Sequence, residues 1–357
     1  MSRNGQEAAA SSPDEETPLL RSGNAEAEIE TAQISSANER RMDLEKRRRD
    51  EMKGYIFMAL SALGFSANSV CVKALAVAKF PSLEIVFARS VMQLVLGLLG
   101  CLYYGISPVG PVGQGSWPVR KLLVQRGAAG AFGNACFFYA LTKMTLADAT
   151  VVFFTSPVFS AIFANAMLGE PYGAFDRVAS AVCMLGIVLV LKPTMVFGSA
   201  EVASLYVGDQ ARGAAAALVG AMSGAFAYCV VRKVGRGVHS MVHVVYFGFL
   251  SMAGSSLAMY AGAQQTARAP ESTYEWAVMA MVGVFAFFGQ VLLNRGLQLA
   301  PAGPGTLMRN LDVVFAFLFG ITLFGEIPDW ISVSGSVVII SCTVAMGLRK
   351  WIESRAN

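Results

Sequence analysis

Three arginines lie inside long apolar segments of this 357-residue chain. Arg89 stands six residues beyond the start of an apolar run at Leu83, Arg295 lies near the end of another run, and Arg309 is about six residues into a third. A guanidinium stays protonated and offers a planar set of donors that suits a carboxylate or a phosphate. A charge within a membrane span costs several kcal/mol unless it faces a cavity or a partner. These arginines therefore predict a site for a small anion.

Neutral polar side chains in the same kind of segment could supply further hydrogen bonds to a ligand and set its shape. For any one of them, a hydrogen bond between two helices is an equally good explanation. The candidates are Asn68, Asn134, Tyr139, Tyr228, Gln290, Asn294 and Asn310.

Two further residues bear on how such a site would be built. Asp312 follows Arg309 by three residues, so the two share a helix face, and a structural ion pair is an alternative to ligand binding by Arg309. Arg295 has its own alternative, because its long stem can reach the cytosolic interface. Pro157 frees a backbone carbonyl inside an apolar segment and predicts a kink there, with a gating role as one interpretation.

The sequence offers no constellation for catalysis, a metal or a cofactor. His239 and His243 have the spacing of two ligands on one helix face, but no third ligand lies near them in the sequence. We find no nucleotide-binding loop and no nucleophile with a partner base. The chain is therefore expected to be no enzyme, to hold no metal or cofactor, and to draw no energy from ATP.

The composition places these residues in a membrane. The chain is 55% hydrophobic and 15% charged, and its first 53 residues hold 9 of the 28 basic and 12 of the 24 acidic side chains. What remains is far poorer in charge than a soluble domain and contains apolar runs of about 20 residues. The net charge of +4 and six cysteines within apolar runs exclude a nucleic-acid binder and a secreted disulfide scaffold. We expect an all-α polytopic membrane protein.

Ten apolar segments can be drawn, each long enough to cross about 30 Å of hydrocarbon. They lie near residues 54–77, 83–105, 124–143, 147–168, 175–196, 212–233, 238–262, 274–298, 303–325 and 329–348. Seven basic residues between Arg40 and Lys53 precede the first segment and predict a cytosolic N-terminus. With that orientation, ten basic residues, Arg126 among them, fall on the cytosolic side and five on the other. Both termini are therefore expected in the cytosol.

Residues 1–53 mix Ser, Ala, Glu and Arg with almost no aromatic residues, which predicts a disordered cytosolic tail. Within it, Glu15, Leu19 and Leu20 are spaced as in an acidic dileucine sorting signal, which adaptor proteins read on endosomal, lysosomal or vacuolar proteins. The alternative is a solvated piece of tail with no such role.

An internal repeat appears when residues 132–171 are laid on residues 288–327. At a constant offset of 156, Phe132-Gly133 matches Phe288-Gly289, and Gly169-Glu170 matches Gly325-Glu326. A unit of five spans is odd in number, so its second copy enters the membrane in the opposite sense. This predicts an inverted repeat, the architecture of many alternating-access transporters.

Two stretches also resemble a known family. Residues 146–150 (LADAT) leading into 156–159 (SPVF), and residues 312–317 (DVVFAF), are similar to the drug/metabolite transporter superfamily with its EamA-like domains, and in particular to subfamily G of solute carrier family 35. The resemblance covers roughly residues 54–352. It implies ten helices in two five-helix repeats around a central cavity, lined mainly by helices 1, 3, 4, 6, 8 and 9. Wider relatives carry nucleotide sugars, amino-acid-like solutes or phosphorylated sugars, and carboxylate transport is linked to the subfamily.

The resulting organisation is a tail (1–53), a first five-helix repeat (54–196), an extracytosolic linker (197–211), a second repeat (212–348) and a C-terminal tail (349–357). The expected function is secondary or facilitative transport of a small organic anion, such as a di- or tricarboxylate. The alternatives are a carrier of nucleotide sugars or neutral metabolites, and a membrane scaffold acting through its tail. The expected partners are the substrate, the bilayer and sorting adaptors, with no nucleic acid. An endosomal, lysosomal, vacuolar, Golgi or plasma membrane would suit the chain, and a homodimer is one open alternative.

Overall fold

The computed structural model describes residues 18–113, 115–141, 143–144, 146–191, 196, 207–261, 268–325 and 330–356, and these residues are helical with short connections. Residues 1–49 and residues 50–357 form two separate compact units. The helices are α1 (Pro18–Val77), α2 (Ser82–Tyr103), α3 (Trp117–Leu141), α4 (Leu146–Phe153), α5 (Ser156–Leu168), α6 (Ala174–Leu191), α9 (Val207–Val234), η1 (Gly235–Gly237), α10 (Ser240–Tyr260), α11 (Thr273–Leu299), α12 (Ala302–Met308), α13 (Leu311–Phe324) and α14 (Trp330–Ala356).

The first unit differs from the disordered tail that the sequence predicts, because α1 already begins at Pro18. Its residues are rich in Ala, Glu, Arg and Lys, which are strong helix formers. Arg41 and Glu45 lie one turn apart and pair at 3.6 Å, with both side chains largely exposed. Such a pair adds only about 0.3–0.5 kcal/mol, so helix propensity rather than packing accounts for this segment. Of the sorting signal, Glu15 lies outside the described residues, whereas Leu19 and Leu20 fall in the first turn of α1.

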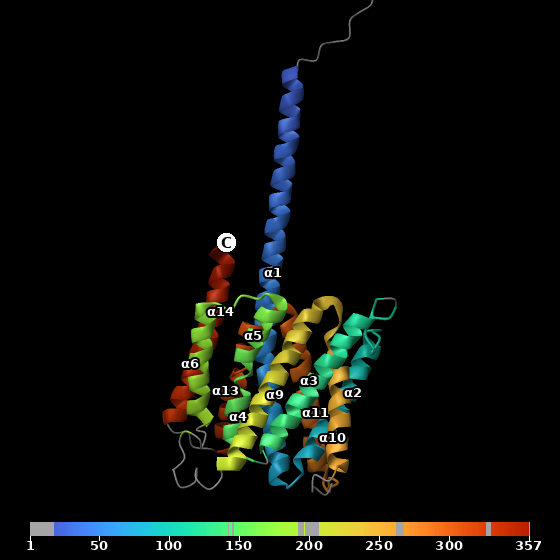
Figure 1. The fold of residues 1–357 in the computed structure, drawn as a ribbon, viewed down its shortest axis with the longest axis vertical. Helices are drawn as coiled ribbons and strands as arrows, with labels where there is room; N and C mark the ends of the chain where they lie inside the picture. The colour runs from blue at the N-terminus through green and yellow to red at the C-terminus, as the bar shows by residue number, and fades with distance from the viewer. Residues whose placement is uncertain are drawn as a thin grey trace, which may run out of the picture. The chain divides into compact units, whose positions relative to one another are not determined.

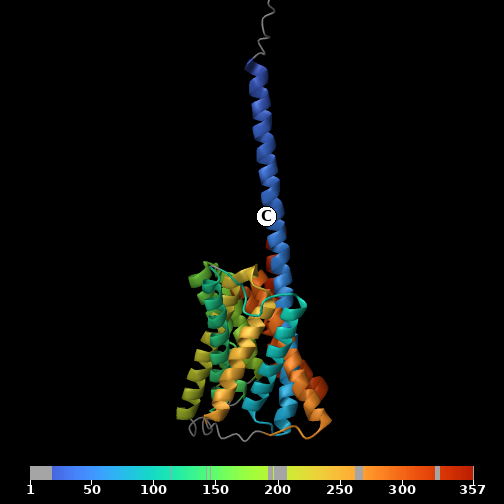
Figure 2. The same cartoon turned by 90° about the vertical axis from the view of Figure 1, so that its right-hand side faces the viewer.

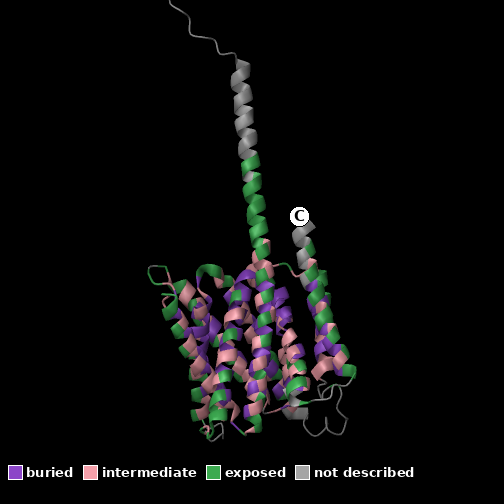
Figure 3. Ribbon diagram, turned by 180° about the vertical axis from the view of Figure 1, so that it is seen from behind, coloured by how far each residue is buried: buried purple, intermediate pink, exposed green. Residues whose placement is uncertain are grey.

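The second unit is a bundle of long helices packed side by side (Figures 1 and 2). The main packing partners are α3 with α9, α2 with α10, and α6 with α14, and α11 packs on α2. Buried residues lie along the faces where helices meet, and exposed residues lie around the outside (Figure 3). Between 28% and 50% of each candidate span is buried, so much apolar surface faces outward, as in a helix bundle surrounded by lipid.

Eight helical stretches in the described part of the chain are long and apolar enough to cross a membrane. The chain is thus an integral, multi-pass membrane protein. Two further long helices complete the bundle: α3, which carries Arg126 and Asn134, and α14, whose apolar part spans Trp330–Met346. Ten spans with both termini cytosolic therefore remain a prediction.

Two of the stretches are broken helices at equivalent places in the repeat. One stretch is interrupted between α4 and α5, where Pro157 stands in the first turn of α5. The other stretch, 156 residues later, consists of α12 and α13 and is interrupted at Arg309 and Asn310. A proline has no amide hydrogen to donate, so the first turn of a helix tolerates it and a helix interior does not. The kink expected at Pro157 is thus a short interruption of the regular α-helix, across which Thr155 keeps φ and ψ of −70° and −10° in the right-handed helical region.

Both broken helices also end alike. α5 ends at Leu168 and α13 at Phe324, again 156 residues apart. The next residues, Gly169 and Gly325, adopt left-handed conformations with φ of 66° and 64°, which glycine reaches without steric cost. The two glycines of the paired Gly-Glu sequences therefore have a structural reason, because each of them terminates a helix.

Candidate substrate-binding site

A cavity of about 100 Å³ lies at the centre of the bundle, beside both helix breaks. Eight helices or their ends contribute to it: α1, α2, α3, α4, α9, α10, α11 and the end of α12. The lining residues are Phe65, Arg89, Arg126, Gly130, Gly133, Asn134, Phe153, Gly224, Ala227, Tyr228, Phe247, Gln290 and Arg309. Three of them are arginines, and no aspartate or glutamate is among them.

Arg126 is the best-held cation of the cavity. Its Nη2 donates to Oε1 of Gln290 at 3.0 Å and to Oδ1 of Asn294 at 3.1 Å. These two acceptors lie one turn apart on α11, so a single helix face fixes the guanidinium. One face of the guanidinium covers the ring of Phe247, 4.8 Å from its centroid. The arginine is only 3% exposed, although it carries a full charge.

Arg309 stands where α12 gives way to α13. Its Nη1 donates to the hydroxyl of Tyr228 on α9. The guanidinium also lies over the ring of Phe65, 4.5 Å from the centroid, and 5.8 Å from that of Tyr228. The helix break thus delivers a cation to the cavity, and aromatic rings cover its faces.

Arg89 reaches the cavity from α2, and its charge repels that of Arg309. In the part of the chain that the structure describes, Arg89, Arg126 and Arg309 make no ion pair with a carboxylate. Asp312 is the acid nearest in sequence, and its Oδ1 accepts from the hydroxyl of Ser66 at 2.7 Å. Asp312 lies within the electrostatic reach of Arg309, but the two form no close ion pair, and the guanidinium of Arg309 bonds to Tyr228 instead.

The buried atoms of the cavity that lack a hydrogen-bond partner are donors. They are Nε of Arg89, Nε and Nη1 of Arg126, Nδ2 of Asn134 and Nε of Arg309. By contrast, the amide oxygen of Gln290 and the hydroxyl of Tyr228 already accept from arginines. An unsatisfied buried donor costs about 1–3 kcal/mol, and more if it is charged. The cavity thus favours a ligand that brings acceptors and negative charge.

Other residues predicted for the site lie elsewhere. Arg295 points to the end of α11, where its Nη1 donates to Oε1 of Gln298 at 3.3 Å. Tyr139 is 48% exposed on α3, and Asn68 is buried in α1 but does not line the cavity. Asn310 donates to Sγ of Cys183 at 3.3 Å and so joins α13 to α6.

Arg126 is the residue that the sequence reading placed differently. The sequence alone indicates a basic residue on the cytosolic side that helps to orient the bundle, because Arg126 follows Arg120 and Lys121 closely. It lies nine residues after Trp117, where α3 begins, which is about 13 Å of helical rise. That depth is the available signal, since Arg120 and Lys121 already stand at the helix start and a third basic residue at such depth cannot reach solvent easily.

The two histidines of the sequence do not meet further metal ligands in the described part of the chain. Within the described residues, no group of three His, Cys, Asp or Glu side chains is arranged to hold a metal ion. His243 is completely buried in α10, whereas His239 begins that helix and accepts at Nδ1 from the amide of Met241 at 3.3 Å.

The comparison with known proteins places the chain in a family. The model of the EamA-like transporter family matches residues 52–192 and again residues 211–348. The chain belongs to this family. Its members are transporters, so the chain is assigned to membrane transport and not to enzymes, and the resemblance drawn from the sequence is confirmed.

Several relatives are similar over most of their length. Human solute carrier family 35 member G1 is 31% identical over 303 residues, covering 84% of this chain and 80% of that protein. The pseudopaline exporter CntI of Pseudomonas aeruginosa is 30% identical, and the match covers 83% of this chain and 96% of that protein. The S-adenosylmethionine uptake transporter of Rickettsia prowazekii is 27% identical, and the match covers 82% of this chain and 92% of that protein. A crystal structure at 16% identity shares the fold, with a TM-score of 0.64 over 87% of this chain and 98% of that one.

Proposed function

We propose that this chain is a secondary or facilitative transporter of a small organic anion with two or more carboxylates. The observation that carries the proposal is the central cavity, where Arg89, Arg126 and Arg309 converge without an acidic residue. Their free N–H groups and the amide of Asn134 need acceptors, and carboxylates supply both acceptors and charge.

The bound anion would neutralise charge at Arg89, Arg126 and Arg309, none of which forms an ion pair with a carboxylate of the described residues. Burying a cation without a counter-ion costs several kcal/mol, so such a cluster is retained where it serves a ligand or an ion pathway. The rings of Phe65 and Phe247 already cover guanidinium faces, which leaves the guanidinium edges for the ligand. A planar carboxylate approaches a guanidinium along such an edge.

The break in each repeat gives a physical route from binding to transport. Arg309 lies at the break between α12 and α13, and Phe153 ends α4 at the equivalent break. A helix break absorbs changes of φ and ψ while the flanking segments stay rigid. An anion that bridges Arg309 with Arg126 on α3 would therefore link rigid parts of both repeats, as alternating access requires.

Uptake into proteoliposomes tests this function. Purified protein should take up labelled di- and tricarboxylates in a saturable manner, and unlabelled carboxylates should compete. Competition by nucleotide sugars or neutral metabolites instead would move the substrate to those classes. Removing residues 1–53 should leave uptake intact and change only the location in cells, whereas a scaffold acting through its tail would lose its function.

A further inference from the structure

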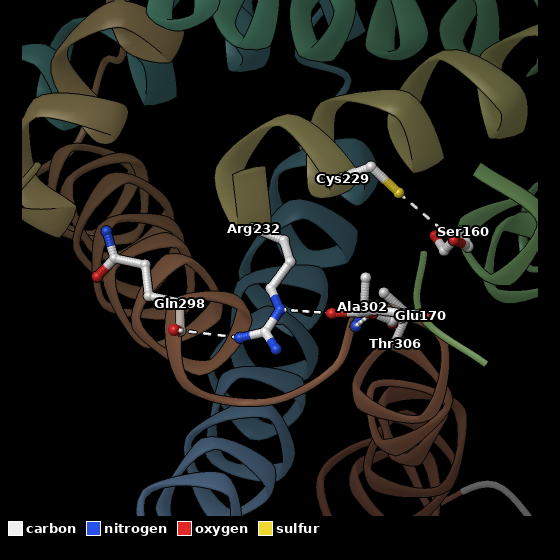
Figure 4. A network of polar contacts seen from close by, with 7 residues as sticks. All are labelled: Ser160, Glu170, Cys229, Arg232, Gln298, Ala302 and Thr306. Atoms are coloured by element: carbon white, nitrogen blue, oxygen red, sulfur yellow. Dashed lines mark hydrogen bonds and ion pairs between the residues drawn. The ribbon is translucent and has the colours of Figure 1, made fainter. Parts of the chain in front are cut away.

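A polar network joins the two halves of the chain at one end of the bundle (Figure 4). Nε of Arg232, at the end of α9, pairs with Oε1 of Glu170 at 2.7 Å. The other oxygen of Glu170 accepts from the backbone amide of Ala302 at 2.9 Å. Nη1 of Arg232 donates to the carbonyl of Gln298 at 3.3 Å. Glu170 lies in the first stretch that matches the family model, and its partners lie in the second. We call these four residues the latch.

The latch lies just beyond the cavity, on the side predicted to be cytosolic. Arg232 follows the cavity residue Tyr228 by one turn of α9, or about 6 Å of rise. Gln298 follows the cavity residue Gln290 by eight residues of α11, or about 12 Å. An anion leaving the cavity toward this side has to pass the latch.

Apolar packing closes the space between cavity and latch. The side chains there belong to one buried cluster and include Met58, Leu293, Leu297 and Leu307, none more than 1% exposed. A Cβ added to Gly296 would stand 2.7 Å from the side chain of Met58 and 3.0 Å from the carbonyl oxygen of Gly54, so α1 and α11 pack closely here. The exit is therefore shut in this conformation.

The ion pair between Arg232 and Glu170 is only partly exposed to solvent, so it can stabilise the closed conformation and can still be broken when the helices separate. The side chains of Arg232 and Glu170 are 24% and 17% exposed, so water screens the pair only in part. Glu170 follows the left-handed Gly169 directly, which fixes the direction in which its side chain leaves α5. Arg295 lies behind the latch, bound to the amide side chain of Gln298, and so belongs to this layer and not to the cavity.

We infer that Glu170 is the gate residue of the cytosolic exit, and that its bonds to Arg232 and Ala302 must break in each transport cycle. The inference rests on the proposed transport function, because a gate has meaning only for a carrier. The latch residues bind no substrate, but they set the balance between the closed and the open conformation. A contact made in only one of two states biases the equilibrium toward that state.

Cys229 offers a built-in reporter for the test. It lies one turn before Arg232 on α9, it is completely buried, and its thiol contacts the carbonyl of Ser160 on α5 at 3.4 Å. Separation of α5 from α9 would expose this thiol. The other five cysteines are replaced, and the full chain is placed in sealed vesicles with the latch end facing outward. A membrane-impermeant thiol reagent then labels Cys229 at a rate that measures opening.

We expect Glu170→Gln to raise the initial labelling rate at least about tenfold over the parent protein, because the closed state loses its ion pair. The matched control is Glu275→Gln, which removes a carboxylate paired with Arg268 at 3.1 Å near the opposite end of α11. It should leave the labelling of Cys229 unchanged. If Glu170→Gln is poorly folded, Arg232→Gln makes the same prediction and keeps the bond from Ala302 to Glu170.

The outcomes separate the gate from the substrate. Equal protection of Cys229 in the parent and in both latch variants would overturn the gate, even if carboxylates are transported. Faster labelling in a protein that transports no carboxylate would keep the gate and refute the anion. Faster labelling in Glu275→Gln as well would show general loosening of the bundle and would also overturn the gate.

Discussion

Arg126→Gln tests the cavity most sharply, because the sequence and the structure disagree about this position. The change removes one of the three positive charges that line the cavity and the donor to Gln290 and Asn294. Truncating one partner of a buried, hydrogen-bonded charge pair typically costs 2–5 kcal/mol of binding. At about 1.4 kcal/mol per factor of ten, the affinity for a dicarboxylate should fall about 30-fold to a few thousand-fold.

The matched control for this experiment is Arg295→Gln. Arg295 carries the same charge and lies on α11, directly after Asn294, but it donates to Gln298 outside the cavity. It should change carboxylate affinity by no more than about threefold, as expected for a residue that does not touch the ligand. Arg126→Lys should fall between these results, because it keeps the charge and loses the planar set of donors.

The assay is a thermal-shift titration of purified protein with a dicarboxylate, followed by uptake into proteoliposomes. A ligand at 100 times its dissociation constant should stabilise the parent protein by about 2.7 kcal/mol. At the same concentration, Arg126→Gln should be stabilised by no more than about 0.9 kcal/mol, the value that a 30-fold loss of affinity leaves. Undiminished stabilisation in Arg126→Gln, together with its loss in Arg295→Gln, would refute the assignment of the cavity.

Three further predictions concern stability. Arg89→Met should leave the ligand-free protein as stable as the parent or up to about 1–4 kcal/mol more stable, because an apolar chain of similar length replaces a half-buried charge that forms no ion pair within the described residues. A lower melting temperature would contradict this. Gly335→Ala should destabilise the protein by about 1–3 kcal/mol where α14 packs on α6, since the added Cβ would stand 2.7 Å from the carbonyl oxygen of Gly186. The control Gly254→Ala adds a Cβ that meets nothing within 4 Å, so the same unfolding assay should find it neutral or slightly stabilising. Burial and the charge of Arg295 lower the pKa of His239 below its usual 6.5. On acidification the unfolded chain therefore takes up this proton before the folded chain does, and the stability of the folded protein should fall as the pH drops below about 6.5. His239→Asn, which can still cap the helix, should flatten this part of the pH profile of the melting temperature, and an unchanged profile would contradict the reasoning.

The sequence predicted the class of fold because the relevant signals are local or additive. Apolar runs of about 20 residues announce membrane helices, and the ungapped offset of 156 places Gly169 and Gly325 at equivalent helix ends, where the structure has the same left-handed turn. Pro157 announced an interruption for the same reason, since the missing amide hydrogen acts on its own helix.

The cavity could be predicted only in part because it depends on which helix faces meet. The cavity is lined by five of the residues that the sequence predicts for a substrate site, namely Arg89, Arg309, Asn134, Tyr228 and Gln290, and their binding of a substrate stays a prediction. Depth along a helix separates buried charges from snorkelling ones, but the direction of each side chain depends on the rotation of its helix.

Rotation explains the residues that were placed differently. On α11, the face with Gln290 and Asn294 turns toward Arg126, and Arg295 follows one residue later on another face. Glu170 illustrates a second limit. The repeat revealed it as half of a Gly-Glu pair, but its bonds to Arg232 and Ala302 join residues more than 60 positions apart, which no local pattern indicates.

The most direct test of the central claim is uptake of a labelled tricarboxylate into proteoliposomes by the parent protein and by the variant with Arg89, Arg126 and Arg309 all replaced by glutamine. The account predicts saturable uptake by the parent and none above empty liposomes by the triple variant, although that variant folds and inserts normally. Undiminished uptake by the triple variant would contradict the account.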